Sequence, residues 1–281
     1  MENRKVWFVT GASKGLGLAL AQKLLAEGFA VAATSRSIDE LKTAVGNTGE
    51  QFLPLSVSLT DEQSVEKAIA DTLATFGRID VVVNNAGYGL AGSLEELSDV
   101  ESRGNFDVNV FGTLNVIRAV MPHLRAQRSG HILNISSIAG VTGGFPGFGI
   151  YCATKFAVSG LSESLAAEAA DFGVKVTVVE PGYFRTDFLT AGSFVTPKNS
   201  IADYQKVRDS EALHQQQING QQPGDPAKAA DAMIRITGEA NPPLHLVLGE
   251  DAFGLAQTKL AAFSEELENW KSVSVSTNFD A

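Results

Sequence analysis

Val6-Trp7-Phe8-Val9-Thr10-Gly11-Ala12-Ser13-Lys14-Gly15-Leu16-Gly17 is the stretch that decides the fold. Its first five residues form an apolar run that predicts a buried strand, and the leucine-rich residues up to position 28 predict a helix directly after the glycines. Glycines between a strand and a helix let the backbone turn tightly and direct helix N-terminal amides at a phosphate. We therefore expect Gly11, Gly15 and Gly17 to bind a dinucleotide pyrophosphate, although their spacing differs from the commoner G-x-G-x-x-G pattern.

The same pattern repeats along the chain, because short apolar runs and helical patterns continue to alternate. A capping box at Thr60-Asp61-Glu62-Gln63 predicts a helix that ends near Phe76, and Ser98–Gln127 predicts a long helix that Gly104 and Pro122 bend or shorten. Such alternation predicts an α/β fold with a doubly wound parallel sheet, helices on both faces, and ligands at the carboxyl ends of the strands. The expected strands after the first are Phe29–Thr34, Phe52–Val57, Val81–Val83, His131–Ile135 and Val174–Val179.

Composition limits the possible partners and compartments. The 281 residues carry 22 basic and 32 acidic side chains, a formal charge of -10, and such a surface repels nucleic acid and anionic membranes. No apolar segment approaches the roughly 18 residues of a membrane span. The single cysteine, Cys152, excludes an internal disulfide and is expected to be a buried helix residue. A single cysteine suits a reducing compartment, so we expect a cytoplasmic protein. The four histidines lack ligand spacing, so we expect no metal site.

Tyr151 and Lys155 stand four residues apart in a good helix-forming run, so their side chains project from one face of a helix. An ammonium group beside a tyrosine favours the phenolate and lowers the pKa of the phenol toward neutrality. The pair therefore predicts an acid/base catalyst, although such pairs also occur by chance on solvated helix faces.

The second expected strand ends in Thr34-Ser35-Arg36-Ser37, where a site for NAD usually carries an acidic residue that binds the ribose 2'-hydroxyl. The first carboxylate comes only at Asp39. Arg36 and Lys14 instead offer cationic donors for a 2'-phosphate. We expect NADP(H) as the cofactor in preference to NAD(H), unless both cations are ordinary surface residues.

Several motifs, in their order, resemble the short-chain dehydrogenase/reductase family over about residues 4–190. The motifs are Thr10–Gly17, Asn84–Gly87, Asn109, Ser137, Tyr151-x3-Lys155 and Pro181-Gly182. The resemblance implies a single Rossmann-type domain over residues 1–250, a seven-stranded sheet whose last strand is Leu244–Leu248, and an added C-terminal helix and tail over residues 251–281. The run Tyr151–Leu161 is similar to hydroxysteroid and retinol dehydrogenases of the family in particular.

The resemblance also implies a catalytic tetrad. Tyr151 would exchange a proton with the substrate oxygen, and Ser137 would stabilise the charge that develops on that oxygen. Lys155 would lower the pKa of the phenol and hold the nicotinamide ribose. Asn109 would position a water molecule next to Lys155, unless it merely satisfies helix backbone. Ser136 competes for the serine role, but the residues that follow fit the family register better with Ser137.

The family pattern implies a cofactor site that extends well beyond the glycine turn. Two positions depart from the pattern, because Ser58 replaces an aspartate that contacts adenine and Phe184 is bulkier than the usual branched aliphatic residue. Thr186 matches the residue that holds the carboxamide. The implied cofactor residues are Gly11, Ser13, Lys14, Gly15, Leu16, Gly17, Arg36, Ser58, Asn85, Ala86, Gly87, Tyr151, Lys155, Pro181, Gly182, Phe184 and Thr186.

The segment Tyr183–Gln222 is a long insertion, and we expect it to be a mobile substrate lid. Its aromatic residues Phe188, Phe194 and Tyr204 would form an apolar wall for a hydrophobic ketone or alcohol, unless they only pack beneath the loop. In the family, the helices at residues 98–127 and 151–172 pair across a twofold axis, which implies a homodimer or homotetramer, with a monomer as the alternative. A stripe in the tail is expected to cover the domain or a neighbouring subunit: Leu255, Leu260, Phe263, Leu267 and Trp270.

Three functions stay open at this point. An NADPH-dependent reductase of a ketone or aldehyde agrees with all four tetrad residues. An NADP-dependent secondary-alcohol or hydroxysteroid-type dehydrogenase would use the same residues in the opposite direction. A non-catalytic NADP-binding regulatory protein is possible on this fold, but the intact tetrad argues against it.

Overall fold

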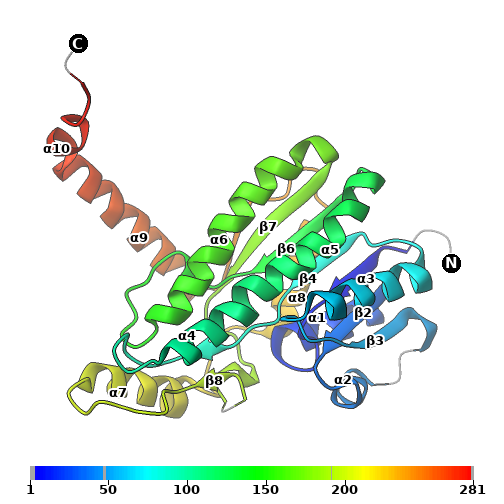
Figure 1. The fold of residues 1–281 in the computed structure, drawn as a ribbon, viewed down its shortest axis with the longest axis horizontal. Helices are drawn as coiled ribbons and strands as arrows, with labels where there is room; N and C mark the ends of the chain where they lie inside the picture. The colour runs from blue at the N-terminus through cyan, green and yellow to red at the C-terminus, as the bar shows by residue number, and fades with distance from the viewer. Residues whose placement is uncertain (1–3, 47–48, 191, 280–281) are drawn as a thin grey trace.

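A central sheet of seven parallel strands organises the protein (Figure 1). The computed structural model describes residues 4–46, 49–190 and 192–279. The strand order β3-β2-β1-β4-β6-β7-β9 confirms the predicted doubly wound parallel sheet and its seventh strand. The strands are β1 (Val6–Val9), β2 (Ala30–Ser35), β3 (Phe52–Ser56), β4 (Val81–Asn84), β6 (Gly130–Ile135), β7 (Val174–Pro181) and β9 (His245–Leu248).

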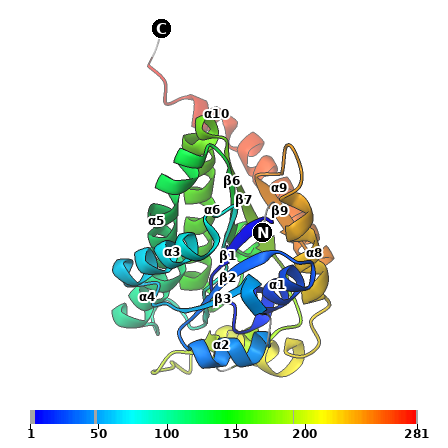
Figure 2. The ribbon, with the colours of Figure 1, turned by 90° about the vertical axis from the view of Figure 1, so that its right-hand side faces the viewer.

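Helices cover both faces of this sheet, and Figure 2 shows the two layers on either side of it. Side chains alternate along a strand, so Trp7 and Val9 of β1 pack into one apolar core while Phe8, between them, packs into the other. The two cores hold the sheet from both sides and fix its strand ends. One layer contains α1 (Gly15–Ala26), α2 (Ile38–Val45) and α8 (Pro226–Ile236), and the other contains α3 (Glu62–Phe76), α5 (Gly112–Gln127) and α6 (Gly149–Ala169).

The predicted capping box at the start of α3 is wrong. Asp61 is the N-cap residue, and its carboxylate accepts a hydrogen bond of 3.1 Å from the backbone N–H of Gln63. An aspartate one residue after Thr60 caps the helix alone, because its carboxylate reaches the free N–H groups of the first turn. The structure has a capping box at Ser98 and Glu101 instead, where α4 (Asp99–Phe106) begins.

The long helix predicted over residues 98–127 consists of α4 and α5 joined by the π-helical turn η2 (Asp107–Phe111). The irregularity therefore lies at η2 and not at Gly104 or at Pro122, which α5 contains. A π-helical turn inserts one extra residue per turn and rotates the side chains on it, and such turns are frequent at functional sites. Here it carries Asn109.

The predicted lid contains helices and a short strand of its own. The 3-10 turn η5 (Asp187–Leu189) is followed by β8 (Phe194–Val195), α7 (Gln205–Ala212) and the π-helical turn η6 (Leu213–Ile218). Strand β8 pairs in parallel with β5 (Gly89–Leu90), which forms a second sheet of two strands that the sequence analysis missed. In Figure 1 this segment lies at one end of the molecule, beside the start of α6.

The C-terminal helices are α9 (Glu250–Asn269) and α10 (Lys271–Val275). In Figure 1 they project away from the body of the protein. The predicted stripe on α9 therefore does not cover its own domain, because its side chains, from Leu255 to Trp270, are exposed. Within the described ranges, no helix combines the length and the apolar composition that crossing a membrane requires.

Candidate active site

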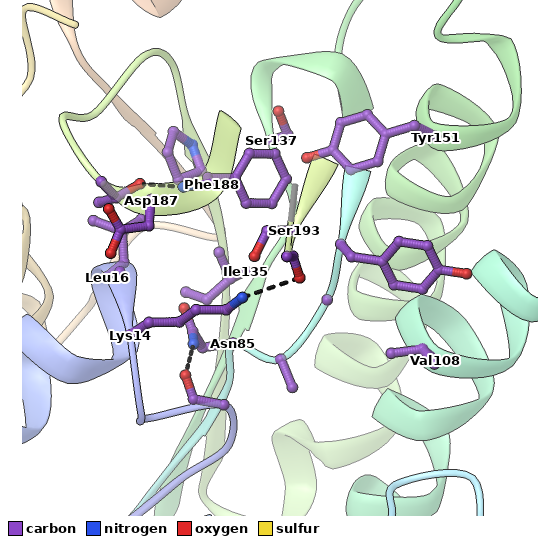
Figure 3. Close-up of a pocket in the computed structure, with 18 of the residues that line it drawn as sticks. Lys14, Leu16, Asn85, Val108, Ile135, Ser137, Tyr151, Asp187, Phe188 and Ser193 are labelled. Atoms are coloured by element: carbon purple, nitrogen blue, oxygen red, sulfur yellow. Dashed lines mark hydrogen bonds between the residues drawn. The ribbon is translucent and has the colours of Figure 1, made fainter. Parts of the chain in front are cut away.

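A cavity of about 910 Å³ opens where β1, β4, β6 and β7 end. Figure 3 shows residues that line it: Lys14 approaches from the glycine turn, while Tyr151 points in from α6 toward Ser137 and Phe188. Sixteen of the seventeen predicted cofactor residues line this cavity, and Gly17 is the exception. Of the predicted tetrad, Ser137, Tyr151 and Lys155 line it, whereas Asn109 lies behind the wall.

The glycine turn is held in place by Thr10 and Asn85. The Asn85 amide group donates hydrogen bonds of 3.0 Å to the backbone carbonyls of Thr10 and Gly11, and its backbone N–H donates to the Thr10 hydroxyl. A Cβ atom on Gly17 would lie 2.4 Å from Asn85 Nδ2 and 2.5 Å from the Gly11 oxygen. Gly11 adopts a φ of 66°, a conformation that favours glycine. Close packing therefore requires glycine at these two positions, while Gly11 and Gly15 of the turn border the cavity.

The two predicted cations both border the cavity, and they differ in their contacts. Lys14 Nζ donates a hydrogen bond of 3.0 Å to the backbone oxygen of Gly192 and so joins the glycine turn to the lid segment. Among the described residues, the Arg36 guanidinium has no hydrogen bond or ion pair with another side chain. Its backbone oxygen accepts a hydrogen bond from Ser56. Arg36 thus keeps its donors available, whereas Lys14 would have to exchange a partner.

Tyr151 lies in the first turn of α6 and is only 8% exposed. Burial raises its pKa above the ordinary value of a phenol, and the hydroxyl of Ser137 only partly opposes this effect. The predicted fall of the Tyr151 pKa toward neutrality is therefore not found in this structure, and a lowering effect of Lys155 stays a prediction. Desolvation disfavours the phenolate more strongly than its neighbours favour it, so the phenol carries its proton at neutral pH.

Lys155 lies beneath the Tyr151 ring, with Nζ 5.7 Å from the ring centroid. The ammonium group donates a hydrogen bond of 2.9 Å to the backbone oxygen of Ile135, at the end of β6. Burial lowers the pKa of Lys155 to about 8, because a charged group loses its hydration there. The residue can therefore lose or gain a proton close to physiological pH.

The two neighbouring serines have different surroundings. Ser136 is buried, and its hydroxyl donates a 2.9 Å hydrogen bond to the backbone oxygen of Lys155 and contacts the Ser159 hydroxyl at 3.0 Å. Ser137 accepts a hydrogen bond from the N–H of Ala139, which leaves its proton free to be donated. Ser136 thus supports the α6 backbone, and Ser137 is the serine whose hydroxyl is available beside Tyr151 (Figure 3).

Asn109 uses its whole side chain to hold the loop after β4. Its Oδ1 accepts a hydrogen bond of 3.0 Å from the backbone N–H of Tyr88, while Nδ2 donates to the Tyr88 oxygen at 3.0 Å and to Thr154 at 3.1 Å. A Cβ atom on Gly87 would lie 3.0 Å from Asn109 Oδ1 and 3.7 Å from Lys155 Nζ. Asn109 therefore positions the wall next to Lys155, and its predicted role in holding a water stays a prediction.

Aromatic side chains form the part of the cavity that lies away from the glycine turn. Phe145, Phe148 and Phe188 line it, and the Phe188 ring lies 6.1 Å from the ring of Tyr151. Phe194 lies one layer behind them, with its ring 5.7 Å from Phe148. The prediction that Tyr204 belongs to this wall is wrong, because its hydroxyl donates to the carboxylate of Glu95 on the outside of the lid segment.

Three polar residues of this end were missed by the sequence analysis. The hydroxyl of Tyr183 lies 2.8 Å from His214 Nε2, and His214 Nδ1 lies 2.7 Å from the oxygen of Ser210. Gln222 is 1% exposed and lines the cavity, yet both of its amide atoms lack a hydrogen-bond partner among the described residues. No local sequence signal marks these residues, because segments distant in the chain bring them together.

Beyond β7, the chain is held close to the start of α9. The carboxylate of Asp251 accepts a hydrogen bond of 2.8 Å from the N–H of Tyr183. A Cβ atom on Gly182 would lie 2.3 Å from the same carboxylate, so this contact requires glycine. Phe184 forms a parallel bridge with Gly224, which fixes the direction of the chain as it enters the lid segment.

Comparison with known proteins now adds to this geometry. A family model described as short chain dehydrogenase matches residues 5–193. The chain belongs to the short-chain dehydrogenase family. It is 38% identical over 274 residues to the oxidoreductase BOA17 of Botryotinia fuckeliana, which covers 97% of this chain and 99% of that one. It is 33% identical over 254 residues to retinol dehydrogenase 8 of Bos taurus, and the match covers 84% of this chain and 78% of that one. It is thus an oxidoreductase of this family, as predicted.

Solved structures share the fold. A short-chain dehydrogenase from Streptomyces avermitilis superposes with a TM-score of 0.90 at 40% identity, covering 99% of this chain and 100% of that one. ElxO with NADP bound has a TM-score of 0.74 at 28% identity, and the superposition covers 90% of this chain and 100% of that one. A 3-ketoacyl-(acyl-carrier-protein) reductase from Brucella melitensis complexed with NADH has a TM-score of 0.71 at 26% identity, covering 87% and 96%.

Proposed function

We propose that this chain reduces a hydrophobic ketone or aldehyde to an alcohol with NADPH, and that Tyr151 is the general acid. One observation carries the proposal. The Tyr151 hydroxyl enters a cavity that has an open glycine turn on one side and an aromatic wall on the other, with Ser137 beside it. A substrate oxygen placed between the two hydroxyl groups would receive hydrogen bonds from both.

The protonation state of Tyr151 is the one that a reduction requires. Because burial holds the pKa of Tyr151 above its ordinary value, the phenol has a proton to give to a carbonyl oxygen at neutral pH. Ser137 donates its free proton to the same oxygen and stabilises the negative charge that develops there. Lys155, with its pKa near 8, is the residue best placed to return a proton toward Tyr151.

A nicotinamide dinucleotide fits the other end of the cavity. The backbone of the glycine turn borders the cavity at Gly11 and Gly15 and suits a pyrophosphate, and Gly87 leaves room beside Lys155. When bound, the reduced cofactor supplies the hydride. Arg36, with its unengaged guanidinium, would hold a 2'-phosphate, and ElxO, a structural relative, has NADP bound. Another relative is complexed with NADH, so the preference for NADPH rests on the residues of this chain.

The preference for NADPH is tested with Arg36→Ala. Removing a charged hydrogen bond costs roughly 1.5–3 kcal/mol, so NADPH affinity should fall by about tenfold or more while NADH affinity stays unchanged. Lys42→Ala, which removes an exposed lysine of α2, is the control. Fluorescence titration with both cofactors measures the effect. Equal losses for NADH and NADPH would contradict a role in binding the 2'-phosphate.

The reaction itself is tested with a panel of carbonyl compounds of increasing size and apolar character. Oxidation of NADPH is followed by the absorbance of the reduced nicotinamide, and the matching alcohols are assayed with NADP. We expect faster turnover of bulky apolar ketones than of small polar ones, because the far wall is aromatic. Turnover of alcohols alone would support the dehydrogenase alternative, and cofactor binding without any turnover would support a regulatory protein.

A further inference from the structure

Helix α9 leaves the body of the protein after two turns. Ala252 and Ala256 pack against Ile138 in a small apolar cluster, and the rest of the helix is exposed. The 20 residues of α9 span roughly 30 Å at about 1.5 Å per residue, and Figures 1 and 2 show the helix extending beyond the sheet. A helix of this length has marginal stability alone in water, so a packing partner is needed to hold it.

One row of apolar side chains on α9 follows a heptad spacing, and all of its members except Ala256, which packs against Ile138, are exposed. Apolar residues recur after three, four, three, four and three positions, which is the pattern of a coiled-coil seam. Leu255 falls outside this pattern, so the seam differs slightly from the stripe predicted from sequence. The seam consists of Phe253 (57% exposed), Ala256 (8%), Leu260 (65%), Phe263 (49%), Leu267 (53%) and Trp270 (65%).

We propose that α9 pairs with α9 of a second copy of this chain as an antiparallel two-helix coiled coil. The seam is self-complementary in that direction. When Leu260 of one copy faces Phe263 of the other, Ala256 faces Leu267, and Phe253 faces Trp270. The smallest seam residue thus meets a large one, and the same contacts occur twice about a twofold axis, as a closed dimer requires.

Charges beside the seam favour the same register. In an antiparallel pair, a position that flanks the seam faces the same heptad position of the other copy. Lys259 of one copy therefore lies opposite Glu266 of the other, and Glu250 lies opposite Lys271. Both lysines between residues 250 and 275 therefore meet an opposite charge. A parallel pair in register would match only Glu266 with Lys271, and it would place both protein bodies at the same end of the helices.

The buried area and the charge of α9 argue for a second copy and against a membrane. A fully buried aromatic side chain loses roughly 150–250 Å² of accessible surface, and the seam offers three aromatic and two leucine side chains that are about half exposed. Together with its flanking residues, the seam offers an accessible surface that approaches the roughly 800 Å² per partner buried in a stable interface. Residues 250–275 carry five acidic and two basic side chains, so an anionic membrane would repel them.

Sedimentation of the full chain at micromolar concentration tests the proposal. We expect Leu267→Asp to halve the assembly mass, because it places a charge within the apolar seam and raises the dissociation constant by at least roughly tenfold. Ala262→Glu introduces a charge at an exposed position of the same helix outside the seam, and it should leave the mass unchanged. Reductase activity should persist in both variants, since neither residue borders the cavity.

A charge swap tests the direction without disturbing the apolar residues. Lys259→Glu should weaken the assembly several-fold, and the double variant Lys259→Glu/Glu266→Lys should restore it, because Lys259 meets Glu266 only in the antiparallel pair. Two variants, Phe253→Cys and Trp270→Cys, each add one cysteine on α9 to a chain whose native Cys152 is buried, and they should form mixed disulfides when oxidised together. Disulfides only between identical chains would show a parallel pair and overturn the proposed direction.

Two results would overturn the proposal as a whole. One is an unchanged assembly mass in Leu267→Asp, whatever the mass of the parent chain. The other is a monomeric parent chain that binds phosphatidylcholine vesicles through Leu267, which would assign the seam to a lipid surface.

Discussion

The two ends of the cavity are built in different ways. The end at the glycine turn is built largely on the backbone of one stretch, residues 10–17, which Asn85 holds through hydrogen bonds. The other end consists of aromatic and amide side chains that arrive from the loop before α6, from η5, and from residues 214–222. The first end is rigid because hydrogen bonds fix its backbone, whereas the second depends on how the lid segment packs.

This difference separates binding of the cofactor from choice of the substrate. A backbone cradle tolerates few changes, because an added Cβ atom collides with main-chain atoms at once. A wall of side chains can change shape one residue at a time without disturbing the sheet. The four variants below act on one end, or on the tyrosine between the two, and each should leave the properties of the opposite end unchanged.

Tyr151→Phe should have the largest effect. It removes only the hydroxyl group, so turnover should fall by at least the roughly 10²-fold typical of a general acid while the affinity for NADPH stays within about twofold. Stopped-flow absorbance and cofactor titration measure the two quantities. The control is Tyr204→Phe, whose hydroxyl contacts Glu95 outside the cavity. Near-normal turnover in Tyr151→Phe would remove this residue from the proposed mechanism.

Gly17→Ala should damage the cofactor end. The new Cβ atom would displace the Asn85 amide group or the Gly11 carbonyl, so we expect NADPH affinity to fall by at least about tenfold and the melting temperature to drop. Gly160→Ala is the matched control, because that helical glycine has open space where a Cβ would lie. Isothermal titration and calorimetry measure both effects. Equal behaviour of the two variants would show that the turn is less tightly packed than proposed.

The same difference between the two ends explains which features of the fold and the site the sequence predicts. The strands and the turn after β1 are local patterns, so the sequence predicts them, and it also places Tyr151 and Lys155 in one helix. The sequence does not predict the raised pKa of Tyr151, because that pKa depends on burial by side chains from several segments. Tyr204 and Phe188 looked alike in sequence, yet only Phe188 turns into the cavity. Gln222 was missed for the same reason, since nothing near it in sequence shows that its amide group is buried.

Gln222→Met should affect the substrate end alone. A buried amide group without partners costs roughly 1–3 kcal/mol, so replacing it with an apolar side chain of similar length should stabilise the protein. If the amide group binds the substrate, the KM for the best ketone should rise several-fold while NADPH affinity stays constant. Gln221→Met, at the exposed neighbouring position, is the control. Higher stability with an unchanged KM would mean that the amide group contacts no substrate.

Glu96→Gln should have the smallest effect, because it acts on the anchor of the lid segment and not on the cavity. The buried Glu96 carboxylate accepts hydrogen bonds from the N–H groups of Ser93 and Ile201 at 2.7 Å and pairs with Arg208 at 2.8 Å. We expect a rise in KM of about two- to fivefold and faster hydrogen exchange over α7, because a neutral amide group binds Arg208 more weakly. Glu66→Gln, which changes an exposed glutamate of α3 away from the lid segment, is the control.

The same anchor predicts a dependence on pH. Burial alone would raise the pKa of Glu96, but hydrogen bonds from Ile201 and Ser93 and the charge of Arg208 hold it below the ordinary value of 4.5. A carboxyl group whose pKa is lower in the folded state stabilises that state above about pH 4.5 and loses this contribution as the pH falls further. Limited proteolysis within the lid segment should therefore accelerate below pH 4.5 in the parent chain and much less in Glu96→Gln. Strong protection of both proteins at every pH would mean that the segment is a fixed wall and not a lid.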